Sequence, residues 1–280
     1  MEQTKYRSSY FNDIGLRLAQ KLFGLEYLHY GFFEKAPKTL AGLPAAQEEY
    51  VQKVLAQIPT EGVTKVLDVG CGAGGVAKQL VSRGYDVTCV DPDPFMLNKT
   101  YEATGGKIQR FQGLYEQVTE VPTDAFDMVL MSESCQYVPF TLGFTQHKKH
   151  LRLGGHVLIA DFFKVRDLDY PYLSKSGHNL NEFLAEAKRQ GFELVKDIDI
   201  TQETAPTMDI YQDILSNRAF PVAEALFEYV ERKFPAVYKI LRFFVGKKAL
   251  FLKQKYSAQD ALTFKKYKSY RIFLFKKVQA

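Results

Sequence analysis

The feature of this sequence that most constrains its fold is a short apolar run that ends in a cluster of glycines. The run occupies residues 65–70, and Cys-Gly-Ala-Gly-Gly at 71–75 leads into a segment with helical spacing. A strand, a glycine turn and a helix in this order let the backbone approach a ligand closely. Glycine has no side chain there, and the first helical turn has free N–H groups. The sequence therefore predicts a ligand site at residues 65–75.

Strands and helices continue to alternate to about residue 200. We expect further strands at 85–90, 108–111, 126–131, 156–162 and 192–200, with helices at 76–83, 94–104, 141–151 and 180–190. Alternation of this kind is typical of a mostly parallel sheet with helices on both faces. The uninterrupted apolar residues 128–131 fit a strand that is buried on both sides.

The two ends of the chain differ from this alternating core. Residues up to about Tyr30 and residues 43–58 have helical spacing, and Pro59 ends the second helix. From 201 to about 266 the alternation stops in favour of several helices, and a last strand follows at 269–276. We therefore predict an α/β fold with a seven-stranded, mostly parallel sheet, helices on both faces, and a helical insertion between strands six and seven.

This prediction divides the chain into four parts: an N-terminal helical cover at 1–60, a Rossmann-like cofactor-binding core at 61–200, a helical lid insertion at 201–268 and the last strand of the core sheet at 269–280. The insertion is too long for a plain loop. We expect it to cover the carboxyl edge of the sheet, with apolar side chains that either line a pocket or pack onto the body. The candidates are Phe227, Ile240, Leu241, Phe243, Phe244, Leu250 and Phe251.

Two acids near the glycine turn indicate the kind of ligand. Asp68 stands two residues before Gly70, and Asp91 closes the next predicted strand, 21 residues after Gly70. A dinucleotide would place its pyrophosphate at this turn, where the carboxylate of Asp68 would repel it. S-adenosylmethionine has no phosphate and carries cationic ammonium and sulfonium groups, while Asp91 can accept ribose hydroxyls in either ligand. Asp68 therefore favours S-adenosylmethionine.

At this point the sequence resembles the class I, Rossmann-like methyltransferases that use S-adenosylmethionine, in particular those acting on small molecules. The resemblance covers about residues 65–200. It consists of acid-x-Gly-x-Gly at 68–72, the acid Asp91 after strand two, Phe-Asp at 126–127 and Leu-Arg-Leu-Gly-Gly at 151–155. It implies an enzyme that transfers the methyl group of S-adenosylmethionine.

The resemblance also implies a set of cofactor-binding residues: Asp68, Gly70, Cys71, Gly72, Asp91, Pro92, Met96, Leu114, Tyr115, Ser132 and Tyr30. Tyr30 belongs to an aromatic segment at 25–33 that looks like the Tyr-Gly-aromatic segment folding over the cofactor in small-molecule methyltransferases. One position departs from the family, because many members have an acid after strand three where this chain has Leu114. Backbone groups and packing against Leu114 or Tyr115 are the alternative for holding the adenine.

The acceptor site is expected at the loop after strand four, because ligands bind at the carboxyl ends of parallel strands. Glu133 is a candidate general base or acceptor-orienting carboxylate, and it could equally be a solvated loop acid. Tyr137 is a candidate pocket wall or core residue, and His178 a candidate catalytic and substrate-contacting residue. His147 and His150 are expected at the surface. The loop at 131–137 lacks the Asn/Asp-Pro-Pro-Tyr sequence usual in enzymes that methylate nucleobase amines.

We therefore expect the acceptor to be a small organic molecule, which could be apolar or amphiphilic. Its nucleophile could be nitrogen, oxygen or carbon. The alternative is a nucleic-acid or protein methyltransferase that uses the basic C-terminal region. A third possibility is a cofactor-binding module without catalysis or a nicotinamide enzyme.

Residues 232–277 contain 14 Lys or Arg and one acid, a net charge of +13, whereas the rest of the chain carries −8. Such a region suits a solvated face, an anionic substrate, nucleic acid or an anionic membrane surface.

The remaining features indicate a soluble intracellular chain. No stretch approaches the roughly 20 apolar residues of a membrane span, and residues 1–10 are polar, so we expect a cytoplasmic location. The three cysteines, Cys71, Cys89 and Cys135, show no metal-ligand spacing and are expected to be reduced and unpaired. No metal site is predicted.

Overall fold

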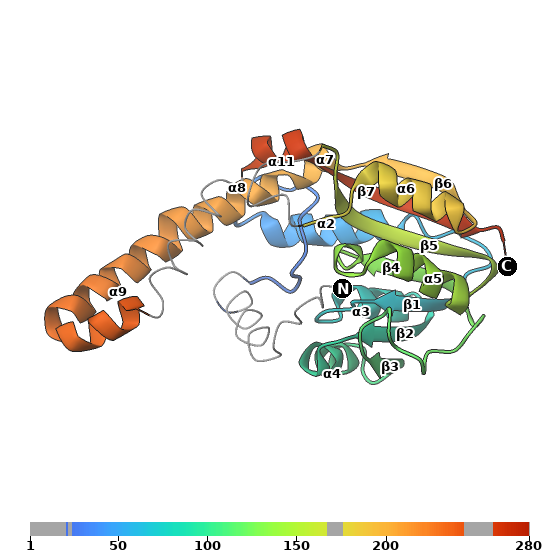
Figure 1. Ribbon diagram of the computed structural model, residues 1–280, viewed down its shortest axis with the longest axis horizontal. Coiled ribbons are helices and arrows are strands. Elements are labelled where there is room, and N and C mark those ends of the chain that lie inside the picture. Colours follow the sequence, from blue (N-terminus) through green and yellow to red (C-terminus); the bar gives the residue numbers. More distant parts are fainter. Residues whose placement is uncertain (1–20, 22–23, 167–175, 244–259, 280) are drawn as a thin grey trace.

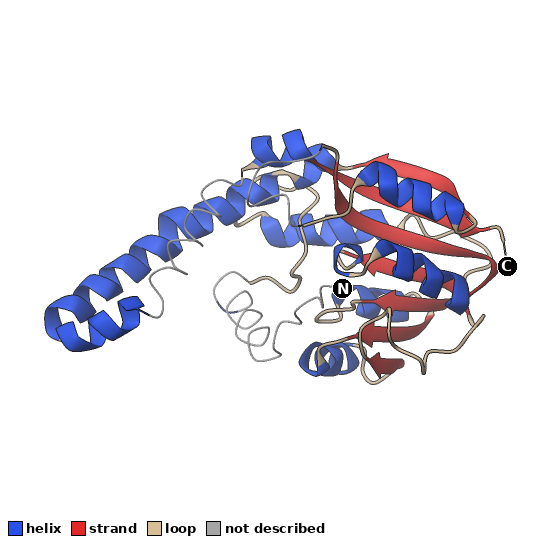
Figure 2. Ribbon diagram, viewed as in Figure 1, coloured by secondary structure: helices blue, strands red, loops and turns tan. Residues whose placement is uncertain are grey.

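The computed structural model describes residues 21, 24–166, 176–243 and 260–279. Its centre is a seven-stranded sheet (Figure 2). The strands are β1 Lys65–Val69, β2 Asp86–Asp91, β3 Ile108–Gln112, β4 Phe126–Ser132, β5 Leu151–Lys164, β6 Phe192–Asp199 and β7 Lys268–Lys277, in the order β3-β2-β1-β4-β5-β7-β6. Strands β1 to β5 pair in parallel, and β7 runs antiparallel to both β5 and β6. The predicted mostly parallel sheet is confirmed.

Helices cover both faces of this sheet because its strands are apolar on both sides. Val66 and Met128 pack into one core cluster with residues of α2 (Leu43–Leu55), α3 (Gly75–Ser82) and α4 (Pro94–Ala103). The next residues along the same strands, Leu67 and Val129, point to the other face and pack with α5 (Phe140–His150) and α6 (Leu180–Arg189). The strand order reverses beside β1, so a crevice forms at the carboxyl ends of β1 and β4.

Two predicted boundaries are wrong. Residues 24–42 form an irregular segment ahead of α2, so the helix expected up to Tyr30 does not extend over 24–30; Lys21 is helical, and residues 1–20 and 22–23 lie outside the described residues. Strand β5 begins at Leu151 rather than at 156, because the Gly154-Gly155 pair lies within the strand instead of preceding it. The pairing with β4 shifts register between Phe126 and Met128, which accommodates the irregular start.

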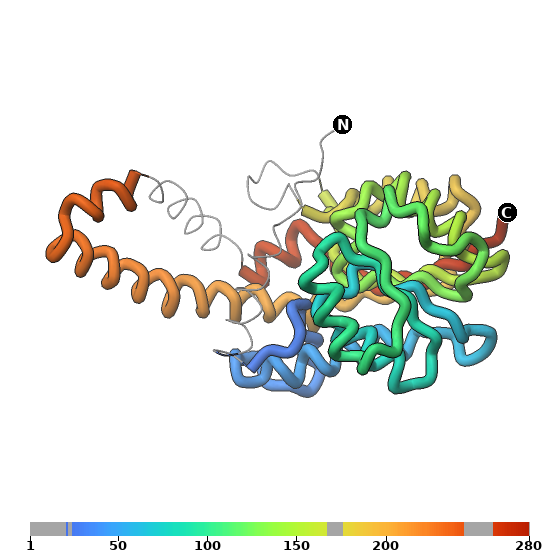
Figure 3. The backbone as a smooth tube through the Cα atoms, turned by 90° about the horizontal axis from the view of Figure 1, so that it is seen from below, coloured from blue at the N-terminus to red at the C-terminus, as the bar shows by residue number. Residues whose placement is uncertain are grey.

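The described part of the insertion after β6 begins as a projecting arm. Helices α7 (Thr201–Thr204) and α8 (Pro206–Asp213), a π-helix (Ile214–Ala219) and α9 (Phe220–Lys233) follow one another, and helix resumes at 235–243. We call residues 206–243 the arm. Figures 1 and 3 show it extending away from the sheet. The backbone stays helical through both junctions, at Ile214 and Phe220, so the arm runs outward as far as Lys233. The helix breaks at Phe234, and the segment 235–243 turns back from the far end (Figure 3).

This arrangement contradicts the expected role of the insertion's apolar residues. Ile240, Leu241 and Phe243 are exposed, and Phe227 is half-buried on α9. Phe244, Leu250 and Phe251 lie outside the described residues. After the arm, α11 (Ala261–Tyr267) returns the chain to β7. Within the part of the chain that the structure describes, no helix is both long and apolar enough to cross a membrane.

Candidate active site

A cavity of about 660 Å³ opens at the carboxyl ends of β1, β2 and β4. Five segments form its wall: the turns after β1 and β2, the loops after β3 and β4, and residues 26–29 of the N-terminal segment. Of the residues singled out from the sequence, twelve line it: Asp68, Gly70, Cys71, Gly72, Asp91, Pro92, Met96, Leu114, Tyr115, Ser132, Glu133 and Tyr137. The fold thus gathers at one place the residues predicted from separate motifs.

The glycine turn after β1 has a shape that only small residues allow. Gly70 has φ +73°, and a Cβ there would lie 2.4 Å from the Cβ of Ser134. A Cβ at Gly75 would lie 2.2 Å from the ring of Tyr27, whose hydroxyl donates to Glu48 at 2.7 Å. The missing side chains therefore let the loop after β4 and the N-terminal segment close over the turn.

Asp68 presents a carboxylate to this cavity that lacks part of its hydrogen bonding. The residue is buried, and its Oδ2 has no hydrogen-bond partner among the described residues. Burial, together with the nearby charge of Asp91, raises the pKa of Asp68 to about 7. A buried acceptor without a partner costs free energy, so the site is suited to a ligand that brings a donor or a positive charge.

Asp91 is held in place by the backbone of both turns. Its Oδ2 accepts from the N–H of Gly72 at 3.1 Å and its Oδ1 from the N–H of Asp93 at 2.8 Å. Burial raises its pKa to about 6, although these two hydrogen bonds act in the opposite direction. Two carboxyl groups with raised pKa values at one turn favour a cationic ligand over an anionic one.

Glu133 follows β4 in a left-handed conformation, with φ +55°, which non-glycine residues rarely adopt. Its Oε1 accepts from the N–H of Tyr30 and from the hydroxyl of Tyr270, both at 2.7 Å. Burial raises the pKa of Glu133 to about 8 despite these hydrogen bonds. The two donors hold one carboxylate oxygen, and the residue as a whole lines the cavity.

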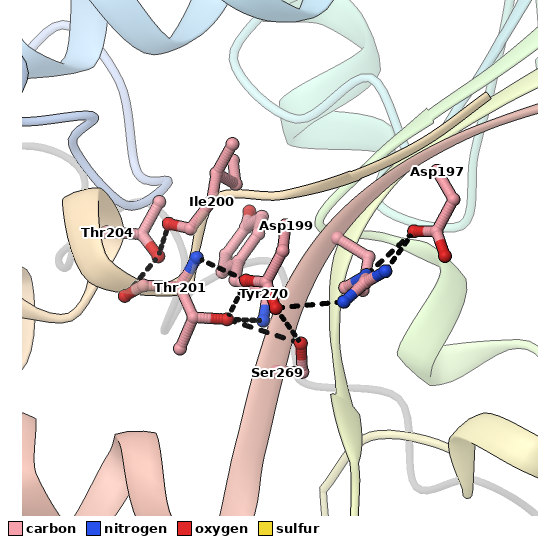
Figure 4. Close-up of polar contacts among 8 residues, drawn as sticks. Asp197, Asp199, Ile200, Thr201, Thr204, Ser269 and Tyr270 are labelled. Carbon is pink, nitrogen blue, oxygen red and sulfur yellow. Dashed lines mark hydrogen bonds and ion pairs between the residues drawn. The ribbon is translucent and has the colours of Figure 1, made fainter.

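Tyr270 is itself fixed by contacts between β6, α7 and β7 (Figure 4). Its N–H donates to the hydroxyl of Thr201 at 2.8 Å, and its carbonyl accepts from the N–H of Ile200 at 2.9 Å. Asp199 accepts from the N–H of Thr201 at 2.9 Å and pairs with Arg271 at 2.8 Å. The last strand of the sheet thus places the phenol against Glu133.

His29 is a cavity residue that was not singled out from the sequence. Its Nδ1 lies 2.8 Å from the carbonyl of Tyr30, which can only accept, so Nδ1 carries the proton. Burial lowers the pKa of the imidazole to about 4, which keeps it neutral near pH 7. Its Nε2 therefore has a lone pair, is buried, and has no hydrogen-bond partner among the residues described. This residue of the cavity wall therefore has one unused hydrogen-bond acceptor.

Two predicted site residues lie outside the cavity. Tyr30 is adjacent to His29 in irregular backbone and points away: its ring packs against Phe162 and Tyr270 and its hydroxyl lies 3.0 Å from Met208 Sδ. It touches the site through its N–H, which holds Glu133. Aromatic character drew the prediction to Tyr30, whereas the imidazole before it faces the cavity.

His178 likewise lies outside the cavity lining, behind the loop after β4. Its Nε2 hydrogen-bonds the carbonyl of Cys135 at 2.9 Å, and its ring stacks on Phe183 and meets Phe140 edge-on. It supports the loop after β4 from behind. The expectation that His147 and His150 are surface residues is also wrong.

Those two histidines stabilise the loop after β3 and the segment ahead of β4. His147 lies 3.0 Å from the hydroxyl of Tyr115, and His150 lies 2.9 Å from the carbonyl of Pro122. The hydroxyl of Tyr115 is thus hydrogen-bonded to His147 inside the protein, and only part of the Tyr115 surface contributes to the cavity wall. The three cysteines are unpaired, as predicted, and all are buried.

A model of the methyltransferase domain family matches residues 36–199, which is more than half of the chain. The chain belongs to this methyltransferase family. The match includes the glycine turn, both aspartates and the loop after β4. The seven-stranded sheet with its antiparallel β7 agrees with this assignment.

Among curated relatives, the chain is 33% identical over 100 residues to a ubiquinone biosynthesis O-methyltransferase of Aliivibrio fischeri. This match covers 34% of the chain and 43% of the relative, so the chain spans less than half the length of that protein.

Solved structures share the whole fold at low identity. A putative sarcosine dimethylglycine methyltransferase from Galdieria sulphuraria superposes with a TM-score of 0.71 at 17% identity, over 97% of this chain and 100% of that one. The cyclase SpnF superposes with a TM-score of 0.67 at 16% identity, over 98% and 97%. Since one of these is named a cyclase, the fold alone does not fix the reaction, and the site has to be argued from its residues.

Proposed function

We propose that this protein transfers the methyl group of S-adenosylmethionine to the hydroxyl oxygen of a small, amphiphilic organic acceptor. The observation that carries the proposal is the buried carboxylate of Asp68, with one oxygen lacking a partner among the described residues, beside a glycine turn at the reversal point of the sheet. Membership of the methyltransferase family supports it.

The residues of the cavity fit S-adenosylmethionine. Asp68 would hold its cationic amino acid end, directly or through water, and Asp91 its ribose hydroxyls, with Gly70 and Gly72 allowing close approach of the backbone. Leu114 and Tyr115 offer apolar surface for the adenine, in place of the acid that many relatives carry. When bound, the cofactor supplies an electrophilic methyl group on a positively charged sulfur.

His29 and Glu133 belong to the side of the cavity where we expect the acceptor to bind. An oxygen nucleophile must lose a proton as it accepts the methyl group, and a positioned base accelerates that step. We propose that Glu133 takes this proton. Burial raises the pKa of its carboxyl group, and the positively charged sulfur of bound S-adenosylmethionine would lower that pKa again, so that the carboxylate is available as a base. The Nε2 of His29 can accept a hydrogen bond from the acceptor and orient it. Tyr137 forms part of the outer wall.

An oxygen acceptor of amphiphilic character agrees with two further points. The partially matched relative is named an O-methyltransferase of ubiquinone biosynthesis. The cavity volume of about 660 Å³ is within the usual range for small-molecule sites, roughly 300–1,000 Å³, which leaves a macromolecular acceptor without support here.

The test is a screen of phenols, catechols, amines and carbon acids with isotopically labelled S-adenosylmethionine, read by mass spectrometry. We expect labelled product from hydroxyl compounds. Glu133→Gln should lower kcat by about 100-fold or more, while affinity for S-adenosylhomocysteine changes little. Glu193→Gln, an exposed change on β6, is the matched control and should be fully active. Full activity of Glu133→Gln would exclude the base, and the absence of product from every hydroxyl compound would exclude the acceptor class.

A further inference from the structure

We propose that the arm binds the surface of an anionic lipid bilayer, through the exposed apolar and basic side chains of residues 220–243. The structure carries this proposal in two independent ways: apolar side chains that nothing in the described protein covers, and a charge distribution that selects the partner. The binding event itself does not depend on the proposed methyl transfer.

The apolar side chains lie in a helical pattern on an arm that projects from the body (Figures 1 and 3). Val222, Leu226 and Tyr229 recur at four- and three-residue spacing, so they share one face of α9. Phe234 follows at the end of α9, and Ile240 lies on the next helical segment. These five side chains are between 55 and 62% exposed. Large apolar side chains exposed together are rare on soluble surfaces and mark a contact with a partner or a membrane.

The second helical segment of the arm is amphipathic. Val237, Ile240 and Leu241 recur at three- and four-residue spacing and are all exposed, while Lys239 and Arg242 lie two residues away from members of this apolar face. A short helix with an apolar face and a basic face is suited to lie in a membrane interface, with apolar side chains among the acyl chains and cations at the headgroups.

Charge selects an anionic partner. Residues 232–243 contain Arg232, Lys233, Lys239 and Arg242, all exposed, and no acid. The acids of α9, Glu224, Glu228 and Glu231, all precede this stretch, and Glu228 pairs with Arg232 at 3.9 Å. If residues 232–243 of two copies of the chain packed against each other, like charges would come together, which opposes self-association. Anionic lipid headgroups supply the missing negative charge, with each basic residue near the surface adding to the attraction.

The position of the arm gives the contact a purpose if the proposed function holds. The arm begins just after β6, whose carboxyl end lies at the same edge of the sheet as the cavity (Figure 1). An arm held on a bilayer would therefore keep this edge near lipid, where an amphiphilic acceptor is concentrated.

The experiment is sedimentation of the full chain with vesicles of phosphatidylcholine alone and of phosphatidylcholine with about one third phosphatidylglycerol. We expect binding to the anionic vesicles that weakens with salt, and little binding to the neutral ones. Lys239→Gln/Arg242→Gln should lower the partition coefficient about 10- to 30-fold, and Ile240→Ser/Leu241→Ser by about tenfold.

Matched controls carry the same changes elsewhere. Lys107→Gln/Lys188→Gln removes two exposed cations from the body, and Leu153→Ser removes an exposed leucine at the start of β5; both should bind vesicles like the wild type. Affinity for S-adenosylhomocysteine and the circular dichroism spectrum report on folding of each variant.

Two outcomes overturn the proposal: no sedimentation with anionic vesicles at low salt, or equal binding by the arm variants and the body controls. A dimer in analytical ultracentrifugation that the Ile240→Ser/Leu241→Ser change dissociates would assign the apolar face to a second copy instead. None of these outcomes touches the methyl transfer, which is measured with soluble acceptors.

Discussion

Asp68 is the residue on which the cofactor assignment depends. Its Oδ2 is buried without a hydrogen-bond partner in the described structure, and burial raises its pKa to about 7. A diphosphate at this turn would face two carboxyl groups, whereas a cation stabilises their ionised forms. The local electrostatics therefore discriminate between the two common ligands of Rossmann-like folds.

This reasoning predicts how cofactor affinity depends on pH. The ammonium group of S-adenosylhomocysteine prefers the ionised form of Asp68, so this ligand should bind about tenfold more weakly at about pH 6 than at about pH 8. In Asp68→Asn the affinity should be low and nearly constant over this interval. Calorimetric titration at several pH values measures both curves, and a wild-type affinity independent of pH would count against Asp68.

Glu133 gives a second prediction at the residue scale. Its folded-state pKa of about 8 exceeds the ordinary 4.5, so the folded protein holds this proton more tightly than the unfolded chain. Its contribution to stability is therefore largest below pH 4.5 and falls as pH rises toward 8. Glu133→Gln should raise the melting temperature of the ligand-free protein by a few degrees at about pH 9 and leave it nearly unchanged at about pH 4. Equal melting temperatures at the higher pH would show that the carboxylate is well solvated.

The sequence indicated Asp68, Asp91 and Glu133 correctly as cavity residues because each stands at the end of an apolar strand, where parallel strands place their ligands. It did not distinguish His29 from Tyr30. Which of two adjacent residues faces the cavity depends on irregular backbone packed against α2 and β7, and no periodicity in the sequence reports that.

The glycine turn between β1 and α3 is the element that closes the cavity floor. Gly70→Ala would combine an unfavourable positive φ with overlap against Ser134, and we expect it to lower the free energy of unfolding by about 2–4 kcal/mol. Gly62→Ala is the matched control: φ is +75°, but no atom lies within 4 Å of the added Cβ, so the cost should be about 1–2 kcal/mol. Urea unfolding compares the two, and equal losses would show that Ser134 moves away freely.

At this scale the sequence predicted the core elements well and their junctions less well. The position of β4 follows from its uninterrupted apolar residues 128–131. The start of β5 does not, because Gly154-Gly155 suggests a turn, whereas β4 pairs with Leu151 before the glycines and with His156 after them.

At the scale of the whole molecule, the arm shows the limit of reading a sequence. Its apolar residues were expected to cover the site, but unbroken helical backbone across Ile214 and Phe220 carries them outward. Conversely, Tyr50 and Tyr270, 220 residues apart, meet at 2.9 Å beside Glu133, a contact that only the sheet order β5-β7-β6 creates. Long-range placement of this kind follows from topology rather than from local pattern.

The central claim, that this cavity holds a cationic sulfur nucleoside, is tested most directly by calorimetric titration of the full chain with S-adenosylhomocysteine and with NAD, for the wild type and Asp68→Ala. We predict that S-adenosylhomocysteine binds, that NAD does not, and that Asp68→Ala weakens S-adenosylhomocysteine binding at least about tenfold while the thermal unfolding transition is retained. Binding of NAD at the glycine turn, or wild-type affinity for S-adenosylhomocysteine in Asp68→Ala, would contradict the account.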